Sequence, residues 1–424
     1  MVYRTWRVGP RARWRSLLVG VFVSAWLLAA GSGAAGATPA ASLVSGTPLA
    51  PAAAAAQLSL PAPTGPRPIG VRSGFLADAS RIDPATGKPR TLPIRVWYPA
   101  RHAAAGRPAP YFSAPVQRAV EQELGVPTGT FDVDTHASTD APMRRHLKGV
   151  ILVSAGLGEP VALQTSQVIE LASRGWVLVT FDHPHDTFVV EQPDGTLIFS
   201  DLEPSLPAIE AAFEQRVLDV GVVLRQLATL LPRRQSAVPV GMFGFSIGGA
   251  AAAESLLRYP RLQAGVDLDG SPFGRVVHEG LDEPFGIMLG RRPLEQDPSL
   301  SLLISRLRGP HPFEQLDIEH HGFTDFVVLN PAATLADPAL GALLEANFAT
   351  GVDSLAAGTA ALSAQRRFLT RFMRRYLRAC HDNHARARRG AVPLPDRLRA
   401  PREVPAERRS RCGGDLNPGA RSIR

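Results

Sequence analysis

A serine between glycines is the feature of this sequence that points most directly to chemistry. The segment Gly244-Phe245-Ser246-Ile247-Gly248 has the form G-x-S-x-G. The apolar run VPVGMF leads into it and the small-residue run GGAAAAESLL leads out, which predicts the strand, tight turn and helix of a nucleophile elbow. Glycines on both sides relieve the crowding of such a turn. A phosphate-binding turn is the alternative, but the Walker lysine and the G-x-G-x-x-G spacing are missing.

A serine hydroxyl attacks well only when a base takes its proton and an acid orients that base. In α/β-hydrolases the chain order is serine, acid, histidine. The adjacent His320 and His321, well downstream of Ser246, are the favoured candidates for the base. Four carboxylates are candidates for the acid, and spacing alone does not rank them: Asp267, Asp269, Glu295 and Asp297.

The oxyanion of an acyl-transfer intermediate needs backbone N–H donors that are already in place. The residue after the nucleophile, here Ile247, supplies one of them. The other comes from a loop after an earlier strand, and the glycine-containing run 154–158 follows the apolar VILV. Within that loop we predict Leu157 as the second donor.

The elements around these residues predict the fold that positions them. Apolar strands around 148–154, 176–181, 238–245, 262–268 and 284–289 alternate with amphipathic helices around 166–175, 207–231 and 247–258. This alternation predicts an α/β fold with a mostly parallel central sheet and helices on both faces. With the elbow at Ser246, it predicts an α/β-hydrolase fold in one catalytic domain, residues 69–380.

The charge of the chain is concentrated at its two ends. The 424 residues carry a formal charge of +8, but residues 1–37 hold five Arg and no acid, and residues 366–424 hold 17 Arg against five acids. The middle of the chain is therefore acidic, which argues against a nucleic-acid partner. Residues 381–424 are predicted to be a basic, disordered tail that could contact an anionic membrane or cell surface.

The N-terminal segment has the pattern of a secretory signal peptide. Five Arg precede the apolar run 16–30, and the small residues Ala35-Gly36-Ala37 follow it. The apolar run of 15 residues is short of the ~20 needed to span a bilayer. We therefore expect cleavage after residue 37 and secretion, with an uncleaved membrane anchor as the alternative. Residues 38–68 are rich in Ala and Pro and are predicted to be a linker.

Neither the cysteines nor the histidine-rich segment predicts a metal site. In an oxidising compartment Cys380 and Cys412 could form a disulfide, with two free thiols as the alternative. The run 182–186, DHPHD, resembles a metal site in composition, but we interpret it as a loop at the rim of the pocket. Arg216 and Asp219, three residues apart on a helix, are expected to pair with each other. No cofactor is expected.

Several segments together resemble the platelet-activating-factor acetylhydrolase (isoform II, plasma-type) family of α/β-hydrolases, in its actinobacterial lipase-like branch. The resemblance extends from about Pro68 to Leu377. It is carried by GVRSGFLAD, LPIRVWYPA, SAGLG, FDHPHDT, EQRVLDV, GFSIGG, GVDLDG and HHGFTDF.

The resemblance implies roles for residues that the pattern alone left open. The family places its acid on the strand directly after the elbow helix and its base in H-x-x-F-x-D, which implies Asp269 and His320, with His321 second. Ala155 replaces the histidine of the family's usual H-G-L-G loop, and this change keeps the backbone donors.

The activity implied by the resemblance is secreted hydrolysis of lipid-type carboxylic esters, similar to that of a 1-alkyl-2-acetylglycerophosphocholine esterase. Alternatives are a polyester, cutin or triglyceride esterase, or an acyltransferase, with the same triad. A catalytically silent hydrolase fold that only binds is a further alternative, although an intact Ser, Asp and His set argues against it.

Overall fold

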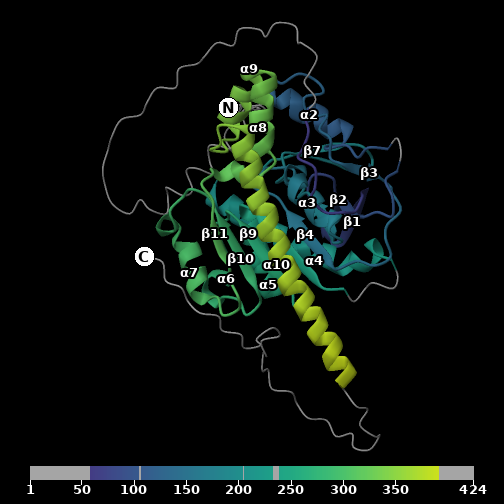
Figure 1. Ribbon diagram of the computed structural model, residues 1–424, viewed down its shortest axis with the longest axis vertical. Helices are drawn as coiled ribbons and strands as arrows, with labels where there is room; N and C mark the ends of the chain where they lie inside the picture. The colour runs from purple at the N-terminus through teal and green to yellow at the C-terminus, as the bar shows by residue number, and fades with distance from the viewer. Residues whose placement is uncertain (1–57, 105–106, 204, 233–237, 391–424) are drawn as a thin grey trace, which may run out of the picture.

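The structure is a computed structural model (Figure 1) that describes residues 58–104, 107–203, 205–232 and 238–390, and their side chains as far as Leu377. Within these residues nine strands form one sheet, in the order β11-β10-β9-β8-β4-β5-β2-β1-β3. The strands are β1 (Ile69–Ile82), β2 (Pro89–Pro99), β3 (Ala137–Thr139), β4 (Val150–Ser154), β5 (Val177–Phe181), β8 (Val240–Phe245), β9 (Leu262–Leu268), β10 (Phe285–Leu289) and β11 (Phe313–Gln315). A separate antiparallel hairpin joins β6 (Val189–Glu191) and β7 (Leu197–Phe199).

Most neighbouring strands of the sheet are parallel, as the sequence predicts. The pairs from β5 through β4, β8, β9 and β10 to β11 are parallel, whereas β2 runs antiparallel to β1 and to β5. The central strands are buried on both faces, which explains why they read as continuous apolar runs.

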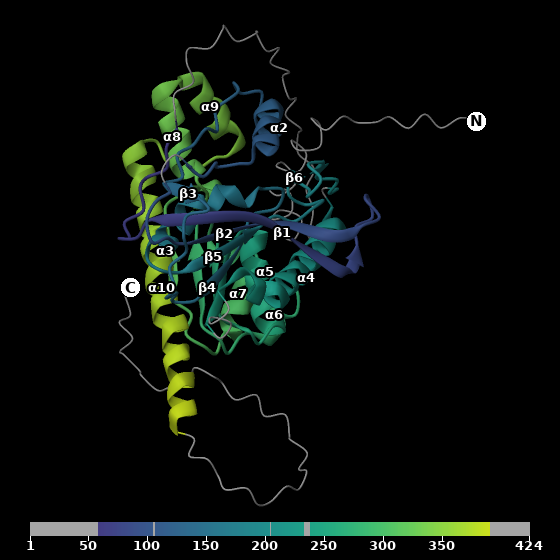
Figure 2. The ribbon, with the colours of Figure 1, turned by 90° about the vertical axis from the view of Figure 1, so that its right-hand side faces the viewer.

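Helices cover both faces of this sheet (Figure 2). One face packs against α4, α5, α6 and α7, and the other packs against α3 and the long α10. The helices are α2 (Ala114–Leu124), α3 (Thr165–Ser173), α4 (Leu206–Leu230), α5 (Ile247–Arg258), α6 (Val276–Glu279), α7 (Pro298–Arg306), α8 (Phe326–Ala336), α9 (Pro338–Asn347) and α10 (Leu355–Gly390), with short 3-10 turns η1 (Val161–Gln164), η2 (Leu294–Gln296) and η3 (His320–Phe323). The predicted arrangement of helices is therefore confirmed.

A third apolar cluster forms a cap that the sequence did not predict. It joins α2, α8 and α9 with residues from 58 to 60, and Figure 2 shows these helices together beyond one edge of the sheet. Leu58 and Leu60 are both buried in it. Arg366 of α10 donates hydrogen bonds to the carbonyls of Pro61 and Ala62.

Two predicted boundaries are therefore wrong. The sequence predicts a linker that extends to residue 68, but residues 58–68 pack on the catalytic domain because Leu58 and Leu60 fill an apolar cap. The helix α10 continues to Gly390, past the boundary set at residue 380, because its sequence has no proline before residue 393.

The remaining terminal predictions concern parts of the chain outside the described residues. These are the signal peptide 1–37, the linker up to residue 57, and the tail from residue 391. Cys412 and the side chain of Cys380 also lie outside, so their pairing stays a prediction. Among the helices that the structure describes, none combines the length and the apolar character needed to cross a membrane.

Candidate active site

The G-x-S-x-G segment forms the sharp turn that its sequence predicts. Ser246 lies between β8 and α5 with a φ of 57° and a ψ of −128°, a conformation rarely adopted by residues other than glycine. A Cβ on Gly244 would lie 2.2 Å from the backbone of Gly248, and one on Gly248 would lie 2.2 Å from the Ser154 carbonyl oxygen. The close approach predicted for both glycines is confirmed, and the strained turn holds the serine at the carboxyl edge of the sheet.

The strand register brings the candidate residues to that same edge. In the sheet Ser154 of β4 pairs with Gly244 of β8, and Phe245 of β8 pairs with Leu268 of β9. Because these strands are parallel, the residues that follow them leave the sheet side by side. The predicted oxyanion loop, Ser246 and Asp269 therefore meet at one edge.

His320 connects the serine to the carboxylate. Its Nε2 lies 3.0 Å from Ser246 Oγ, and its Nδ1 lies 2.6 Å from Asp269 Oδ2. The imidazole comes from η3, beyond β11, and packs on Phe245 with the ring centroids 4.6 Å apart. With Nδ1 protonated toward Asp269, Nε2 can accept the serine proton, which is the arrangement a general base requires.

The environment of Asp269 keeps this carboxylate ionised. Burial alone would raise its pKa, but the hydrogen bond with His320 and the positive charge of Arg292 outweigh burial, so that the pKa lies below its usual range. Its Oδ1 accepts the N–H of Gly290 at 2.8 Å. Asp269 also has a positive φ of 57°, at the point where the chain leaves β9. Its second oxygen is thereby left to orient the imidazole.

The three other candidate acids lie away from the imidazole. Asp267 is buried and its Oδ1 accepts the N–H of Gly270 at 2.8 Å. Asp297 caps the N-terminus of α7 and pairs with Arg292, and Glu295 is exposed on η2. Arg292 thus bridges Asp297 and Asp269, and Asp269 alone of the four is hydrogen-bonded to His320.

The second candidate base, His321, has a different partner. Its Nε2 lies 3.1 Å from a carboxylate oxygen of Glu159, and both side chains are buried. Sequence reasoning did not single out Glu159, although it directly follows the predicted oxyanion loop. This pair joins that loop to the turn that carries His320.

The two predicted oxyanion donors occupy suitable backbone positions. Ile247 is the first residue of α5, where a helix leaves its N–H groups without intrahelical partners. Leu157 lies in the loop after β4, and a hydrophobic cluster places its side chain against residues of α4 and α5, among them Ile247. Neither N–H donates a hydrogen bond within the part of the chain that the structure describes.

The 182–186 segment is a buried polar junction. His183 bridges Ser154 Oγ and Asp219, at 3.0 and 2.8 Å. The spacing of Arg216 and Asp219 predicts that they pair with each other, and this prediction is wrong. Arg216 binds Asp186 instead, and Asp219 binds Arg90. No group of residues that could hold a metal ion occurs in the described ranges.

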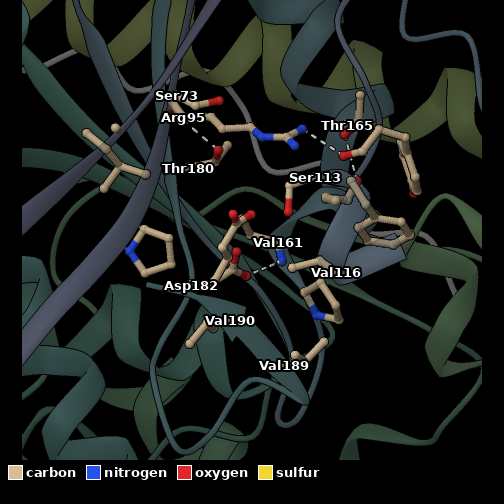
Figure 3. Close-up of a pocket in the computed structure, with 18 of the residues that line it drawn as sticks. Ser73, Arg95, Ser113, Val116, Val161, Thr165, Thr180, Asp182, Val189 and Val190 are labelled. Carbon is tan, nitrogen blue, oxygen red and sulfur yellow. Dashed lines mark hydrogen bonds between the residues drawn. The ribbon is translucent and has the colours of Figure 1, made fainter. Parts of the chain in front are cut away.

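A cavity of about 110 Å³ lies between the strands β1, β2 and β5 and the elements α2, η1 and β6, and Figure 3 shows the residues that line it. Arg95 donates to the carbonyls of Pro110 and Tyr111, and Asp182 accepts the N–H of Val161 at 2.7 Å. Burial raises the pKa of Asp182 to about 6. Ser246, Asp269 and His320 do not line this cavity, so it is separate from the candidate site.

Comparison with a solved structure decides the fold. A ferulic acid esterase from Streptomyces cinnamoneus superposes with a TM-score of 0.66 and 28% sequence identity, over 81% of this chain and 97% of the esterase. The chain has the α/β-hydrolase fold. The fold prediction is therefore confirmed, and the elbow, the imidazole loop and the carboxylate of this α/β-hydrolase lie where that fold assembles a triad.

The α/β-hydrolase also resembles one curated protein in sequence. It is 29% identical over 242 residues to a probable 1-alkyl-2-acetylglycerophosphocholine esterase from Arthroderma benhamiae. That match covers 52% of this chain and 61% of the relative's length. It agrees with the resemblance indicated by the sequence motifs. No protein-family model matches the chain.

Proposed function

We propose that the chain is a serine carboxylic-ester hydrolase that works through an acyl-enzyme. Ser246 is the nucleophile, His320 the base and Asp269 the acid in this proposal. The observation that carries it is the continuous hydrogen-bonded chain from Ser246 Oγ through both imidazole nitrogens to Asp269, on an elbow of the α/β-hydrolase fold.

The reaction would proceed in two halves. Ser246 Oγ attacks the ester carbonyl carbon while its proton moves to His320 Nε2, and the N–H groups of Leu157 and Ile247 bind the oxyanion. The imidazolium then gives the proton to the leaving alkoxide, which leaves an acyl-serine. In the second half His320 takes a proton from water, the hydroxide attacks the acyl carbon, and the carboxylic acid departs as Ser246 regains its proton.

For the substrate we propose a lipid-type ester with a short or oxidised acyl chain. The named activity of the Arthroderma relative and the matching motifs support this choice. An aromatic-acid ester is the second candidate, because the ferulic acid esterase aligns along 97% of its own length. A panel of p-nitrophenyl acyl esters, phosphatidylcholines and methyl ferulate separates the two. A kcat/KM for methyl ferulate above that for every acyl ester and phospholipid would refute the lipid assignment.

The nucleophile is tested by Ser246→Ala on p-nitrophenyl acetate and butyrate. We expect hydrolysis to fall by roughly 10⁴-fold or more, and labelling by a fluorophosphonate probe to disappear. Ser255→Ala makes the same substitution at a buried position of α5, the helix that follows Ser246, and should keep both signals. Wild-type hydrolysis by Ser246→Ala would refute the proposal.

We also propose that the enzyme is exported and that its basic C-terminus holds it near anionic surfaces. The pattern of residues 1–37 supports export. The 17 Arg of residues 366–424, opposed by five acids, support electrostatic attraction to anionic lipid.

A further inference from the structure

A buried ion pair contacts the oxyanion loop. Arg216 of α4 is fully buried, and Asp186, from the loop after β5, is 4% exposed. The guanidinium meets the carboxylate as a two-pronged pair, with Nε 2.5 Å from Oδ2 and Nη2 2.8 Å from Oδ1. Buried pairs of this kind need further hydrogen bonds to offset their desolvation. Here those bonds go to the oxyanion loop.

The pair binds the loop at consecutive peptide groups. Arg216 Nη1 donates to the carbonyl of Ala155 at 2.7 Å, and Nη2 donates to the carbonyl of Gly156 at 2.9 Å. Asp186 Oδ1 accepts the N–H of Gly158 at 3.0 Å. Between these contacts lies Leu157, whose N–H makes no hydrogen bond in the described residues.

Through the planar geometry of the peptide group, these contacts fix the direction of the Leu157 N–H, the proposed oxyanion donor. The Gly156 carbonyl and the Leu157 N–H belong to one planar trans peptide group, in which they point in opposite directions. By binding the carbonyl, Arg216 aims the N–H away from itself. The peptide on the other side of Leu157 contains the Gly158 N–H, so Asp186 fixes that plane as well.

The guanidinium also polarises the donor. A cation bound to a peptide oxygen draws electron density toward that oxygen, which strengthens the hydrogen bonds made by the N–H of the same group. The Arg216 charge stays in place because Asp186 stays ionised: burial would raise the pKa of this carboxyl, but the charge and hydrogen bonds of Arg216 outweigh burial and hold it below its usual range.

We propose that Arg216 and Asp186 are positioning residues of catalysis, which orient and polarise the Leu157 N–H of the oxyanion hole through the Gly156–Leu157 and Leu157–Gly158 peptides. This inference rests on the proposed ester hydrolysis. Neither residue touches the substrate, and neither exchanges a proton with it.

A matched residue separates this role from a purely structural one. Arg90 is also buried and also forms a two-pronged pair, with Asp219 of α4 at 2.9 and 2.8 Å. Its remaining hydrogen bond goes to the Pro184 carbonyl, and it makes no contact with residues 155–158. Arg90→Lys therefore disturbs a comparable buried pair without touching the oxyanion loop.

The test compares Arg216→Gln and Arg216→Lys with Arg90→Lys, using p-nitrophenyl butyrate and thermal melting as a check of folding. We expect Arg216→Gln to lower kcat by ~10²–10³-fold, as expected for loss of an oxyanion donor, with KM changed less than about threefold. Lysine keeps the charge but lacks the planar fork, so its loss of kcat should be about tenfold or more. Should the glutamine variant fail to fold, the lysine variant carries the test.

A tetrahedral mimic provides a readout that a structural role would not move. An alkyl trifluoromethyl ketone adds to the serine and places an oxyanion in the hole, whereas the matching methyl ketone binds without forming one. The Arg216 variants should lose affinity for the trifluoromethyl ketone by the same factor as they lose kcat, and they should bind the methyl ketone as tightly as the wild type does. Arg90→Lys should bind both ketones with wild-type affinity.

Two results would overturn the inference: folded Arg216 variants with the kcat of Arg90→Lys, or a fall in kcat with unchanged affinity for the trifluoromethyl ketone. An inactive wild type, or Ser246→Ala with full activity, would instead refute the proposed function. The two failures are thus distinguishable.

Discussion

Replacing Asp267 by asparagine should change how the stability of this fold depends on pH. Asp267 is 1% exposed on β9, two residues before Asp269, the proposed catalytic acid. Burial raises its pKa to about 8, against a partial offset from the Gly270 N–H and the charge of Arg292. The folded protein therefore holds this side chain as a neutral acid at pH 7.

The sign of the effect follows from the two pKa values. In the unfolded chain an aspartate titrates near 3.8, whereas in the folded chain this group titrates near 8. Between these values the unfolded chain has released the proton and the folded chain has kept it. The group's contribution to stability is therefore fully present below about pH 4 and is lost as the pH rises toward 8. The loss by pH 7 is about 4 kcal/mol, or somewhat more than 1 kcal/mol per pH unit.

Asparagine keeps the shape and the acceptor for Gly270 but does not ionise. The measured quantity is the free energy of unfolding of Asp267→Asn minus that of the wild type. We expect this difference to rise by about 4 kcal/mol from pH 4 to pH 7, because only the wild type loses the stability contributed by this group over this range. Urea denaturation followed by tryptophan fluorescence at several pH values measures this difference, with Asp353→Asn as an exposed control. A difference that is independent of pH, or that falls as the pH rises, would show that Asp267 is not a buried neutral acid.

Three further predictions concern the triad and the tail. Asp269→Asn should lower kcat by roughly 10⁴-fold on p-nitrophenyl butyrate, because it reverses the imidazole tautomer, and Asp297→Asn should stay within about tenfold of the wild type; a larger loss at Asp297 would reverse the assignment of the acid. His320→Ala should abolish turnover, whereas His321→Ala should keep it but lower the melting temperature, since the Glu159 carboxylate would be left buried without its partner; inactivity of a well-folded His321→Ala would contradict this. Deleting residues 391–424 should weaken sedimentation with phosphatidylglycerol vesicles and leave soluble-ester turnover intact, and unchanged vesicle binding would refute a role of the tail.

The strained turn at the candidate nucleophile and the core strands were predictable because their signals are local. The glycines around Ser246 are needed by the turn itself, and each buried strand carries its own apolar run. The candidate oxyanion loop was accessible for the same reason, since it directly follows one of these strands.

The choice among neighbouring polar residues was less accessible to sequence reasoning. Asp267 and Asp269 differ by two positions, and His320 and His321 by one, so composition and spacing treat the members of each pair alike. Family resemblance indicated Asp269 and His320, and the structure places these two against each other. The geometric reason is that β9 ends at Leu268, which turns Asp269 out of the sheet while Asp267 stays within it.

By itself, the sequence determined the central strands of this α/β-hydrolase, the helices that alternate with them and the serine at its elbow, because helix and strand periodicity and tight-turn chemistry depend on residues close together in the chain. Only the tertiary structure decided the partners of the buried charges. Arg216 binds Asp186, 30 positions away, rather than Asp219 three positions away on its own helix. A buried charge is stabilised by whichever opposite charge and carbonyls the packing brings within hydrogen-bonding distance, and packing joins segments that are remote in the sequence.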